Sequence, residues 1–493
     1  MSQRPGTNDK GPRTADSGMS FEFSPFKLVY GGGALGHHSG RPVLASRVLP
    51  GERVEVEEVR KTKGLVHTRT LRILQPSPER IDPPCPYFGG CGGCHYQHFS
   101  PERQAAAKHE ILRETLRRLG KIAWESEIPI HSGPAWNYRN QAQLKVARAS
   151  PDGRAAVGFF EPESHRVFPV DACLILSPRL NAVLSVLGSE PWASRLARPP
   201  TGGEIELLAD DRDKKVMVTL RGLWSPTEGE ALARDCLAGL PGVVGVALGT
   251  ETPLTPALSL GERESVSRRT GKEARRNRTD WSRTRGERHF RIFGEPAVFY
   301  RVGEFQYQIS PGSFFQTSRF LLPELLARVT TAEPCPGWSG AKSGGVAMDL
   351  FAGVGLFSLP LAKRFAQVVS VEANAHAAAD LAANAQAHGL KNLRLVADSV
   401  FDFLRRCAQP EPDLVVLDPP RAGVGINVLK LLLALRPKRL HYVSCSPPTL
   451  ARDLQFLLGH GYRLDSIELF DFFPQTFHIE TLAKTHATDA TPA

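Results

Sequence analysis

The chain has 493 residues, of which 41% are hydrophobic, and it carries a net charge of +10. This length suggests roughly two or three domains, each with enough apolar residues for a core. No run of about 18 apolar residues occurs, and residues 1–20 lack the apolar stretch of a signal peptide, so we expect no membrane span and a cytoplasmic location.

The N-terminal part predicts a small β module after a disordered start. Residues 1–20 are polar and are expected to be disordered. Residues 21–78 contain short alternating segments, such as 53–57 and 64–73, separated by glycine-containing turns. This pattern fits a small β-barrel of the oligonucleotide-binding (OB-like) type, although a generic β module would give the same pattern.

Three of the eight cysteines lie within ten residues of one another. Cys85, Cys91 and Cys94 have the spacing C-x5-C-x2-C on a glycine-rich loop, which in a reducing compartment indicates a metal site rather than disulfides. A fourth ligand must come from elsewhere; Cys173 is the natural candidate and His95 the alternative. The spacing does not separate an iron–sulfur cluster from zinc.

The central part, residues 79–312, mixes strand and helix patterns and is interpreted as an α+β domain. A helix is predicted over residues 101–119, because Ser100 can cap it and a glycine follows it. Residues 251–288 have few large apolar side chains and are interpreted as a flexible basic insertion. Because residues 261–290 alone contribute a net charge of +5, the overall charge favours a nucleic-acid partner only weakly.

From about residue 345 the pattern becomes α/β. Apolar strand segments alternate with helical ones, which predicts a parallel, doubly wound (Rossmann-like) sheet. The strands are expected at 346–350, 368–372, 393–396 and 414–418, and the helices at 356–365 and 373–388. We assign residues 313–483 to this domain and 484–493 to a disordered tail.

A glycine loop after the first of these strands indicates a nucleotide-type cofactor. It reads Asp-Leu-Phe-Ala-Gly-Val-Gly over residues 349–355, with Gly353 and Gly355 at the turn. Glu372 ends the next strand and can accept from both ribose hydroxyls, and Asp398 follows the third strand, where it can contact an adenine amino group. Either acid could instead cap the following helix. A nicotinamide is the rival cofactor, but the dinucleotide fingerprint lacks its third glycine here.

The remaining chemistry lies near the C-terminus. Asp418, in Asp-Pro-Pro-Arg, ends a strand, and Arg421 replaces the aromatic residue of amino-group methyltransferases. Cys445 follows the strand-like run 440–443 and can add as a thiolate to a pyrimidine C6, provided that its pKa is lowered, for which the start of the next helix is a candidate cause. A base must then remove the C5 proton; Glu480 is the better candidate, with His478 orienting it or packing nearby. A lone buried cysteine is the alternative interpretation of Cys445.

Taken together, these segments resemble the RNA 5-methyluridine methyltransferases, in particular the branch acting on 23S ribosomal RNA. The resemblance covers residues 21–483 apart from the insertion, and it includes the Phe-Phe-Gln-Thr segment at 314–317 and the Phe-Pro-Gln-Thr-x-His-x-Glu ending. It implies an N-terminal TRAM barrel, a central domain with a 4Fe–4S cluster and a class I methyltransferase domain. The chain departs from the family pattern at Ser446 and Ser318, which replace asparagines, and at Ala352 and Leu356.

The resemblance also implies roles for individual residues. Cys445 would be the nucleophile and Glu480 the proton acceptor. Four cysteines would hold the cluster: Cys85, Cys91, Cys94 and Cys173. The residues lining S-adenosylmethionine and the reacting base would be Gln316, Phe351, Glu372, Asp398 and Asp418. The helix at 101–119 would pack with the catalytic domain.

The sequence therefore predicts S-adenosylmethionine-dependent methylation of uridine C5 in RNA, with ribosomal RNA favoured and no membrane partner, by a monomer. Transfer RNA is the alternative substrate, and cytosine C5 is a less favoured target. A catalytically silent RNA-binding or redox-sensing iron–sulfur protein is the alternative from another class. It would not need Cys445, Asp418 and Glu480 together, so their joint presence favours the enzyme.

Overall fold

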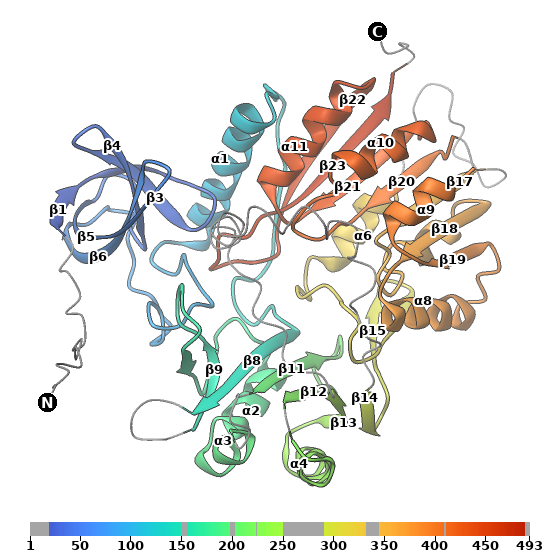
Figure 1. The fold of residues 1–493 in the computed structure, drawn as a ribbon, viewed down its shortest axis with the longest axis horizontal. Coiled ribbons are helices and arrows are strands. Elements are labelled where there is room, and N and C mark those ends of the chain that lie inside the picture. Colours follow the sequence, from blue (N-terminus) through green and yellow to red (C-terminus); the bar gives the residue numbers. More distant parts are fainter. Residues whose placement is uncertain are drawn as a thin grey trace, which may run out of the picture. The chain divides into compact units, whose positions relative to one another are not determined.

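The computed structural model describes residues 19–148, 155–197, 203–222, 224–249, 290–331, 345–408 and 411–488 (Figure 1). Most of the N-terminal segment expected to be disordered and the whole 251–288 insertion lie outside these ranges. The chain divides into two compact units, Met1–Asp82 and Pro83–Ala493, which are described separately. Among the helices in the described ranges, none is both long and apolar enough to cross a membrane.

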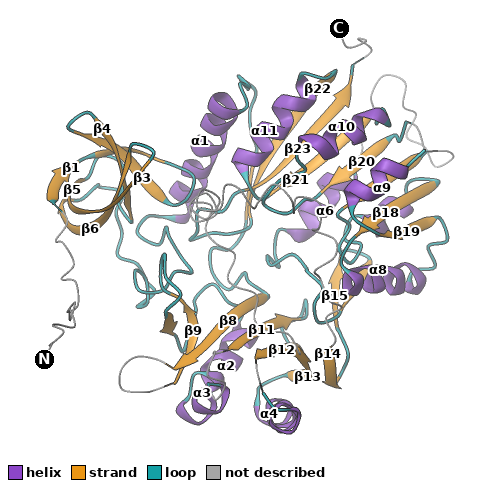
Figure 2. Cartoon of the chain, viewed as in Figure 1, coloured by secondary structure: helices purple, strands orange, loops and turns teal. Residues whose placement is uncertain are grey.

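The first unit is a six-stranded sheet (Figure 2). Its strands are β1 Ser20–Phe23, β2 Pro25–Leu28, β3 Gly33–His38, β4 Arg41–Ser46, β5 Arg53–Thr62 and β6 Leu65–Gln75, in the spatial order β1-β5-β6-β4-β3-β2. The alternation in β5 buries Val54 and Val56. The buried Glu52 accepts hydrogen bonds from the Arg80 guanidinium at 2.5 and 2.8 Å, so the unit extends past residue 78, where the sequence suggests its end.

The second unit contains a seven-stranded sheet that is covered on one face by helices. The strands are β8 Gln141–Arg148, β9 Ala155–Phe160, β10 Val167–Pro169, β11 Gly203–Ala209, β12 Val216–Gly222, β13 Val243–Gly249 and β14 Phe290–Gly294. The helices are α2 Pro178–Leu187, α3 Glu190–Leu196 and α4 Pro226–Gly239. Leu184, Ile205 and Leu207 lie in the core between these two layers. A Ser-Pro pair begins α2 and α4, with the serine hydroxyl accepting a backbone N–H bond.

The same unit contains the α/β sheet that the sequence predicts. Its strands run in the order β19-β18-β17-β20-β21-β23-β22-β7, and β17 to β21 pair in parallel. They are β17 Val346–Leu350, β18 Gln367–Glu372, β19 Leu393–Ala397, β20 Leu414–Leu417, β21 Arg439–Ser444, β22 Tyr462–Asp471, β23 Glu480–Ala487 and β7 Ile130–Ser132. The helices are α6 Leu322–Thr330, α7 Ser358–Ala362, α8 Ala375–Ala387, α9 Val400–Arg406, α10 Ile426–Ala434 and α11 Pro447–Leu458.

Two elements differ from the expectation. The helix expected at 356–365 is only the five residues of α7. Pro360 has no backbone N–H and fits only a first helical turn, so the helix begins late. Residues 484–487, expected in a disordered tail, belong to β23, because this strand pairs with both β21 and β22 and is thereby held inside the sheet.

The helix predicted at 101–119 is α1 Pro101–Leu119, capped by the Ser100 hydroxyl and followed by Gly120. It packs against α11 (Figure 1). A hairpin, β15 Val298–Val302 and β16 Phe305–Ile309, precedes the α/β sheet and contacts α8. Residues 83–493 thus form one compact unit with both sheets, and the border suggested at residue 312 remains an interpretation of the sequence.

Candidate active site

Most of the predicted site residues lie at one edge of the α/β sheet. Phe351, Asp398, Asp418 and Cys445 each follow the last residue of a parallel strand. The carboxyl ends of parallel strands meet at the same edge, where open sheets bind ligands. β23 runs antiparallel to β21, so its first residue, Glu480, begins at this same edge.

The glycine loop at 351–355 has a left-handed backbone at three positions. Phe351 has φ of 70°, Gly353 of 56° and Gly355 of 94°. A Cβ on Gly353 would meet nothing within 4 Å, whereas a Cβ on Gly355 would lie 2.8 Å from Leu359 Cδ1. Gly353 therefore leaves open space beside the loop, and Gly355 allows the loop to pack against α7. A left-handed aromatic residue such as Phe351 is strained, and such strain is typical of functional loops.

Glu372 is tied directly to this loop. Its Oε2 accepts a hydrogen bond from the Gly353 backbone N–H at 2.8 Å, and its Oε1 accepts one from Asn374 N–H at 2.6 Å. The cap of the following helix is the Asn374 side chain. Glu372 is therefore not a helix cap, and its carboxylate lies next to the open side of Gly353.

Asp398 has a different environment. It forms an ion pair with Arg406, and its Oδ1 accepts from Ser399 N–H at 2.7 Å. The cap of α9 is Ser399. Asp398 thus follows β19 as expected, but its carboxylate is already engaged by a cation.

Two further carboxyl groups lie at the ends of neighbouring strands, Asp349 buried in β17 and Asp418 half-buried after β20. Asp349 is fully buried, and burial raises its pKa to about 7 even though Ser358 donates a hydrogen bond to it. Burial, together with the nearby Asp349, also raises the pKa of Asp418 to about 7. Gln316 Nε2 lies 3.2 Å from Asp418 Oδ2 and donates to it, so these two predicted residues are brought together.

Cys445 and Glu480 are brought together by strand register. Ser444 pairs with Thr481 at the end of the β21–β23 ladder, and Cys445 and Glu480 are the residues just beyond this pair. The charge of Glu480 acts on the pKa of Cys445, so the two side chains lie close together. The charge of Asp418 acts on the pKa of both groups, which places it close to the pair. A thiol and two carboxyl groups therefore share one small volume.

The expected low pKa of Cys445 is wrong for this structure. Burial, Glu480 and Asp418 raise the pKa of the Cys445 thiol to about 12, because all three disfavour a thiolate, while Arg421 opposes them. Burial and Asp418 likewise raise the pKa of Glu480 well above its usual value. Cys445 also lies before the first turn of α11, and Ser446 makes no side-chain cap.

His478 contacts Arg421. The Arg421 guanidinium lies 3.3 Å from His478 Nε2, and the imidazole packs 4.3 Å from the Phe477 ring, centre to centre. Burial and the Arg421 charge lower the pKa of His478 to about 2. Such an imidazole stays neutral and is a poor proton acceptor, which leaves Glu480 as the better candidate.

A network around Asp453 was not foreseen from the sequence. Asp453, in α11, is fully buried, and its Oδ2 accepts from Tyr442 OH at 2.8 Å and from Val424 N–H at 2.9 Å. The Asp453 carboxylate therefore fixes the loop that carries Arg421. In the sequence, the only sign of this network is an acidic residue on the buried face of an amphipathic helix.

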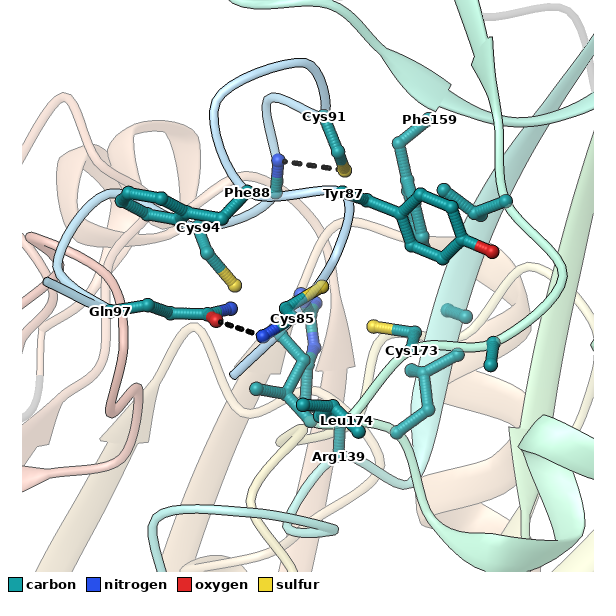
Figure 3. A pocket seen from close by; sticks show the side chains of 16 residues that line it. Cys85, Tyr87, Phe88, Cys91, Cys94, Gln97, Arg139, Phe159, Cys173 and Leu174 are labelled. Atoms are coloured by element: carbon teal, nitrogen blue, oxygen red, sulfur yellow. Dashed lines mark hydrogen bonds between the residues drawn. The ribbon is translucent and has the colours of Figure 1, made fainter. Parts of the chain in front are cut away.

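The four cysteines predicted as ligands line one cavity of about 60 Å³ (Figure 3). Cys85, Cys91, Cys94 and Cys173 point toward the same space, whereas His95 is not among the lining residues and packs on Phe477 instead. Burial raises the pKa of Cys91 to about 11 and that of Cys94 to about 12. Within the described ranges, no three His, Cys, Asp or Glu side chains form a group that could hold a single metal ion as they stand.

Comparison with known proteins identifies relatives along nearly the whole chain. Residues 304–484 match the family described as tRNA (uracil-5-)-methyltransferase. The 23S rRNA (uracil(1939)-C(5))-methyltransferase of Alkalilimnicola ehrlichii is 33% identical over 472 residues, covering 94% of this chain and 96% of the relative. The enzyme of the same name from Thiobacillus denitrificans is 30% identical, covering 92% of this chain and 97% of the relative.

A solved structure has the same fold. It is the tRNA (uracil-54, C5)-methyltransferase of Pyrococcus abyssi in complex with S-adenosyl-L-homocysteine, with a TM-score of 0.68 and 21% identity, covering 94% of this chain and 100% of that one. At this identity the likeness supports the fold alone, a class I methyltransferase domain. The sequence match to curated relatives over more than nine-tenths of their length goes further: this chain belongs to the RNA uracil-C5 methyltransferase family.

Proposed function

We propose that this protein methylates C5 of a uridine in RNA, with S-adenosylmethionine as methyl donor and 23S ribosomal RNA as substrate. The observation that carries the proposal is the closeness of Cys445, Glu480 and Asp418, at the sheet edge where the glycine loop opens. A nucleophile, a proton acceptor and a cofactor cradle are the groups that this reaction needs.

In the proposed reaction Cys445 Sγ, as a thiolate, bonds to C6 of the uracil. This addition moves the electron pair of the C5–C6 double bond onto C5. C5 would then bond to the methyl group of S-adenosylmethionine, whose sulfur–methyl bond breaks and leaves the neutral thioether S-adenosylhomocysteine. Glu480 then removes the proton from C5, the double bond re-forms and the sulfur leaves as a thiolate. S-adenosylmethionine supplies an electrophilic methyl group on a cationic sulfur, and this charge favours ionised carboxyl groups around it.

The residues present fit such a cofactor. Gly353 has open space where a side chain would otherwise stand, and Glu372 lies directly beside it. Glu372 would hold the ribose hydroxyls, while Phe351, Gly355 and Asp398 would line the adenosine part. Gln316 and Asp418, joined by a hydrogen bond, would lie toward the methyl group and the base.

The decisive test of the chemistry is the substitution of Cys445. We expect Cys445→Ala to abolish methylation while S-adenosylhomocysteine still binds, because the thiol is not part of the cofactor cradle. Wild-type protein should become covalently attached to RNA that contains 5-fluorouridine at the target, since the fluorine cannot leave as a proton. Retained turnover in Cys445→Ala, or attachment through another residue, would contradict the assignment. A catalytically silent RNA-binding protein would give no attachment at all.

The choice of RNA rests on the relatives. The two curated relatives described above are named for 23S rRNA and others only as RNA methyltransferases, whereas the family and the solved structure are named for tRNA. The relatives named for rRNA match nearly the full length at higher identity, which favours rRNA. Mapping of 5-methyluridine in ribosomal and transfer RNA, from cells with and without the gene, tests this choice. A site lost only from tRNA would establish the alternative, and a loss of 5-methylcytidine would overturn the target base. We further propose a cytoplasmic monomer.

We also propose that the four cysteines hold a 4Fe–4S cluster. The cavity that Cys85, Cys91, Cys94 and Cys173 line supplies four thiols, the ligand set of such clusters. A single zinc ion would need all four sulfurs at about 2.3 Å from one point. A four-iron cube has its ligands spread around it.

Iron and acid-labile sulfide contents test the cluster without using activity. We expect about four of each per chain in protein purified without oxygen, and a loss of both in Cys91→Ser. Cys407→Ser is the matched control, because Cys407 is half-buried but lies outside the cavity. Zinc without sulfide would refute the cluster. The N-terminal sheet is proposed as the TRAM module.

A further inference from the structure

The loop that leads to Glu480 has a strained and fully enclosed centre. Residues 472–479, here called the base loop, connect β22 to β23, whose first residue is Glu480. Gln475, at the middle of the loop, is 1% exposed and has φ of 69°, in the left-handed region. A non-glycine residue keeps such a backbone only where its surroundings hold it there.

The groups that hold Gln475 all come from residues 95–104, far away in sequence. Gln475 O accepts from the backbone N–H groups of His95, at 2.8 Å, and Tyr96, at 3.0 Å. Gln475 N–H donates to Gln104 Oε1 at 2.7 Å, and Gln104 Nε2 donates to Gln475 Oε1 at 2.9 Å. The backbone of Gln475 and its side-chain oxygen are therefore all bonded to one short segment.

Gln104 is itself fixed. It is fully buried in α1, and its Nε2 also lies within hydrogen-bond distance of Tyr96 O and Phe99 O, at 3.0 and 2.9 Å. One helical turn later, the fully buried Lys108 donates to Asp471 Oδ1 at 2.6 Å and to Phe473 O at 2.9 Å. α1 is thus hydrogen-bonded to the base loop both at its start and at its centre.

We propose that Gln104 is a positioning residue that sets the place of Glu480 through Gln475. This inference rests on the proposed function, in which Glu480 acts only after the carbon–sulfur bond has formed. A displaced Glu480 would therefore slow removal of the C5 proton, and with it release of Cys445, more than it slows addition to C6. The methylated RNA would remain attached to the protein.

The test replaces Gln104 with methionine, which has a similar size and cannot make the four hydrogen bonds. We expect turnover to fall by about 10- to 100-fold, the cost of a small misplacement of a catalytic group. A covalent adduct with ordinary, unfluorinated RNA should accumulate on denaturing gels. We expect the same adduct for Glu480→Gln, which removes the proton acceptor itself. Affinity for S-adenosylhomocysteine should be unchanged. Glu114→Ala, on the same helix and remote from the loop, is the matched control and should behave as wild type.

Gln475→Gly supplies a second variant should Gln104→Met fail to fold. It keeps the backbone bonds, removes the strain and loses the bond to Gln104 Nε2, so we expect a milder form of the same adduct. Loss of turnover without an adduct, or with weakened S-adenosylhomocysteine binding, overturns the inference, because either indicates general damage. Normal turnover in both variants also overturns it. If wild-type protein never attaches to 5-fluorouridine RNA, the proposed function fails first, and the inference with it.

Discussion

Among the single residues of the site, Cys445 matters most, because its surroundings favour the protonated thiol over the thiolate that the reaction needs. Burial and two neighbouring carboxyl groups raise its pKa to about 12, and Arg421 is the cation that acts in the opposite direction. The thiolate is the nucleophile, so a raised pKa disfavours the reactive form of this side chain.

One prediction concerns pH. Below the pKa, the thiolate fraction of Cys445 grows about tenfold per pH unit, so the rate of attachment to 5-fluorouridine RNA should rise from about pH 7 to about pH 9 without a plateau. Arg421→Gln should lower this rate at each pH, because removing the cation raises the pKa further. Attachment rates measured on denaturing gels check both the pH dependence and the effect of Arg421→Gln. The substitution Arg405→Gln, at an exposed position, is the control. A plateau near neutrality would show that the pKa of Cys445 is low.

Asp349 gives a second prediction at this scale. Its pKa, raised to about 7 by burial, exceeds the value in an unfolded chain, so the folded state binds the extra proton. The free energy of unfolding should therefore fall as the pH rises from about 4 to about 7, by up to about 1.4 kcal/mol for each pH unit. Asp349→Asn should flatten this dependence in denaturant unfolding of the ligand-free protein. An unchanged slope would mean that Asp349 is ionised when folded.

At the scale of elements, α11 and the strand before it hold the Arg421 loop. Asp453 bridges Tyr442 of β21 to the backbone N–H groups of Val424 and Gly425. Asp453→Ala would remove the acceptor of the Tyr442 hydroxyl and of the Gly425 N–H, and would leave Val424 N–H with only the Tyr442 oxygen at 3.1 Å. Each donor left without a partner costs about 1–3 kcal/mol. We expect a large loss of unfolding free energy. RNA should also attach to Cys445 more slowly, because Arg421 is no longer fixed.

The matched control for Asp453 is Tyr442→Phe. It removes one hydroxyl and leaves the carboxylate on its backbone partners, so a loss of about 1 kcal/mol is expected from unfolding curves. The rate of RNA attachment should then change little. If both variants lose stability equally, the backbone bonds of Asp453 contribute nothing and the network is not what holds the loop.

The elements also show how far sequence reasoning reaches. Strands such as Val346–Leu350 and the helix Pro101–Leu119 were predictable, because apolar runs and caps are local signals. The closeness of Cys445 and Glu480 depends on β23 entering the sheet between β21 and β22, which no local pattern encodes. The raised pKa of Cys445 was missed for the same reason. It depends on carboxyl groups that only the fold brings near.

At the scale of the whole molecule, the cysteine cavity and the base loop are joined by one short segment. His95 and Tyr96, which donate to Gln475 O, directly follow Cys94, and Gln97 Oε1 accepts from Cys85 N–H at 3.2 Å. The same segment therefore lines the cavity and holds the loop before Glu480. Sequence alone shows a cysteine motif and a distant glutamate, with nothing to join them.

This arrangement predicts that damage to the cavity reaches the base loop. In Cys94→Ser the segment at 95–97 loses an anchor, so the backbone N–H groups of residues 473–480 should exchange with deuterium faster, because local opening becomes easier. Exchange in β17 and β18, on the far side of the sheet, should stay unchanged, and Cys407→Ser should leave both regions as in wild type. Uniform acceleration across the sheet would mean global destabilisation. Unchanged exchange at 473–480 would show that the segment 95–97 is not needed to hold the loop and that Gln104, Lys108 and the Tyr138 hydroxyl, which donates to Pro474 O at 2.9 Å, suffice.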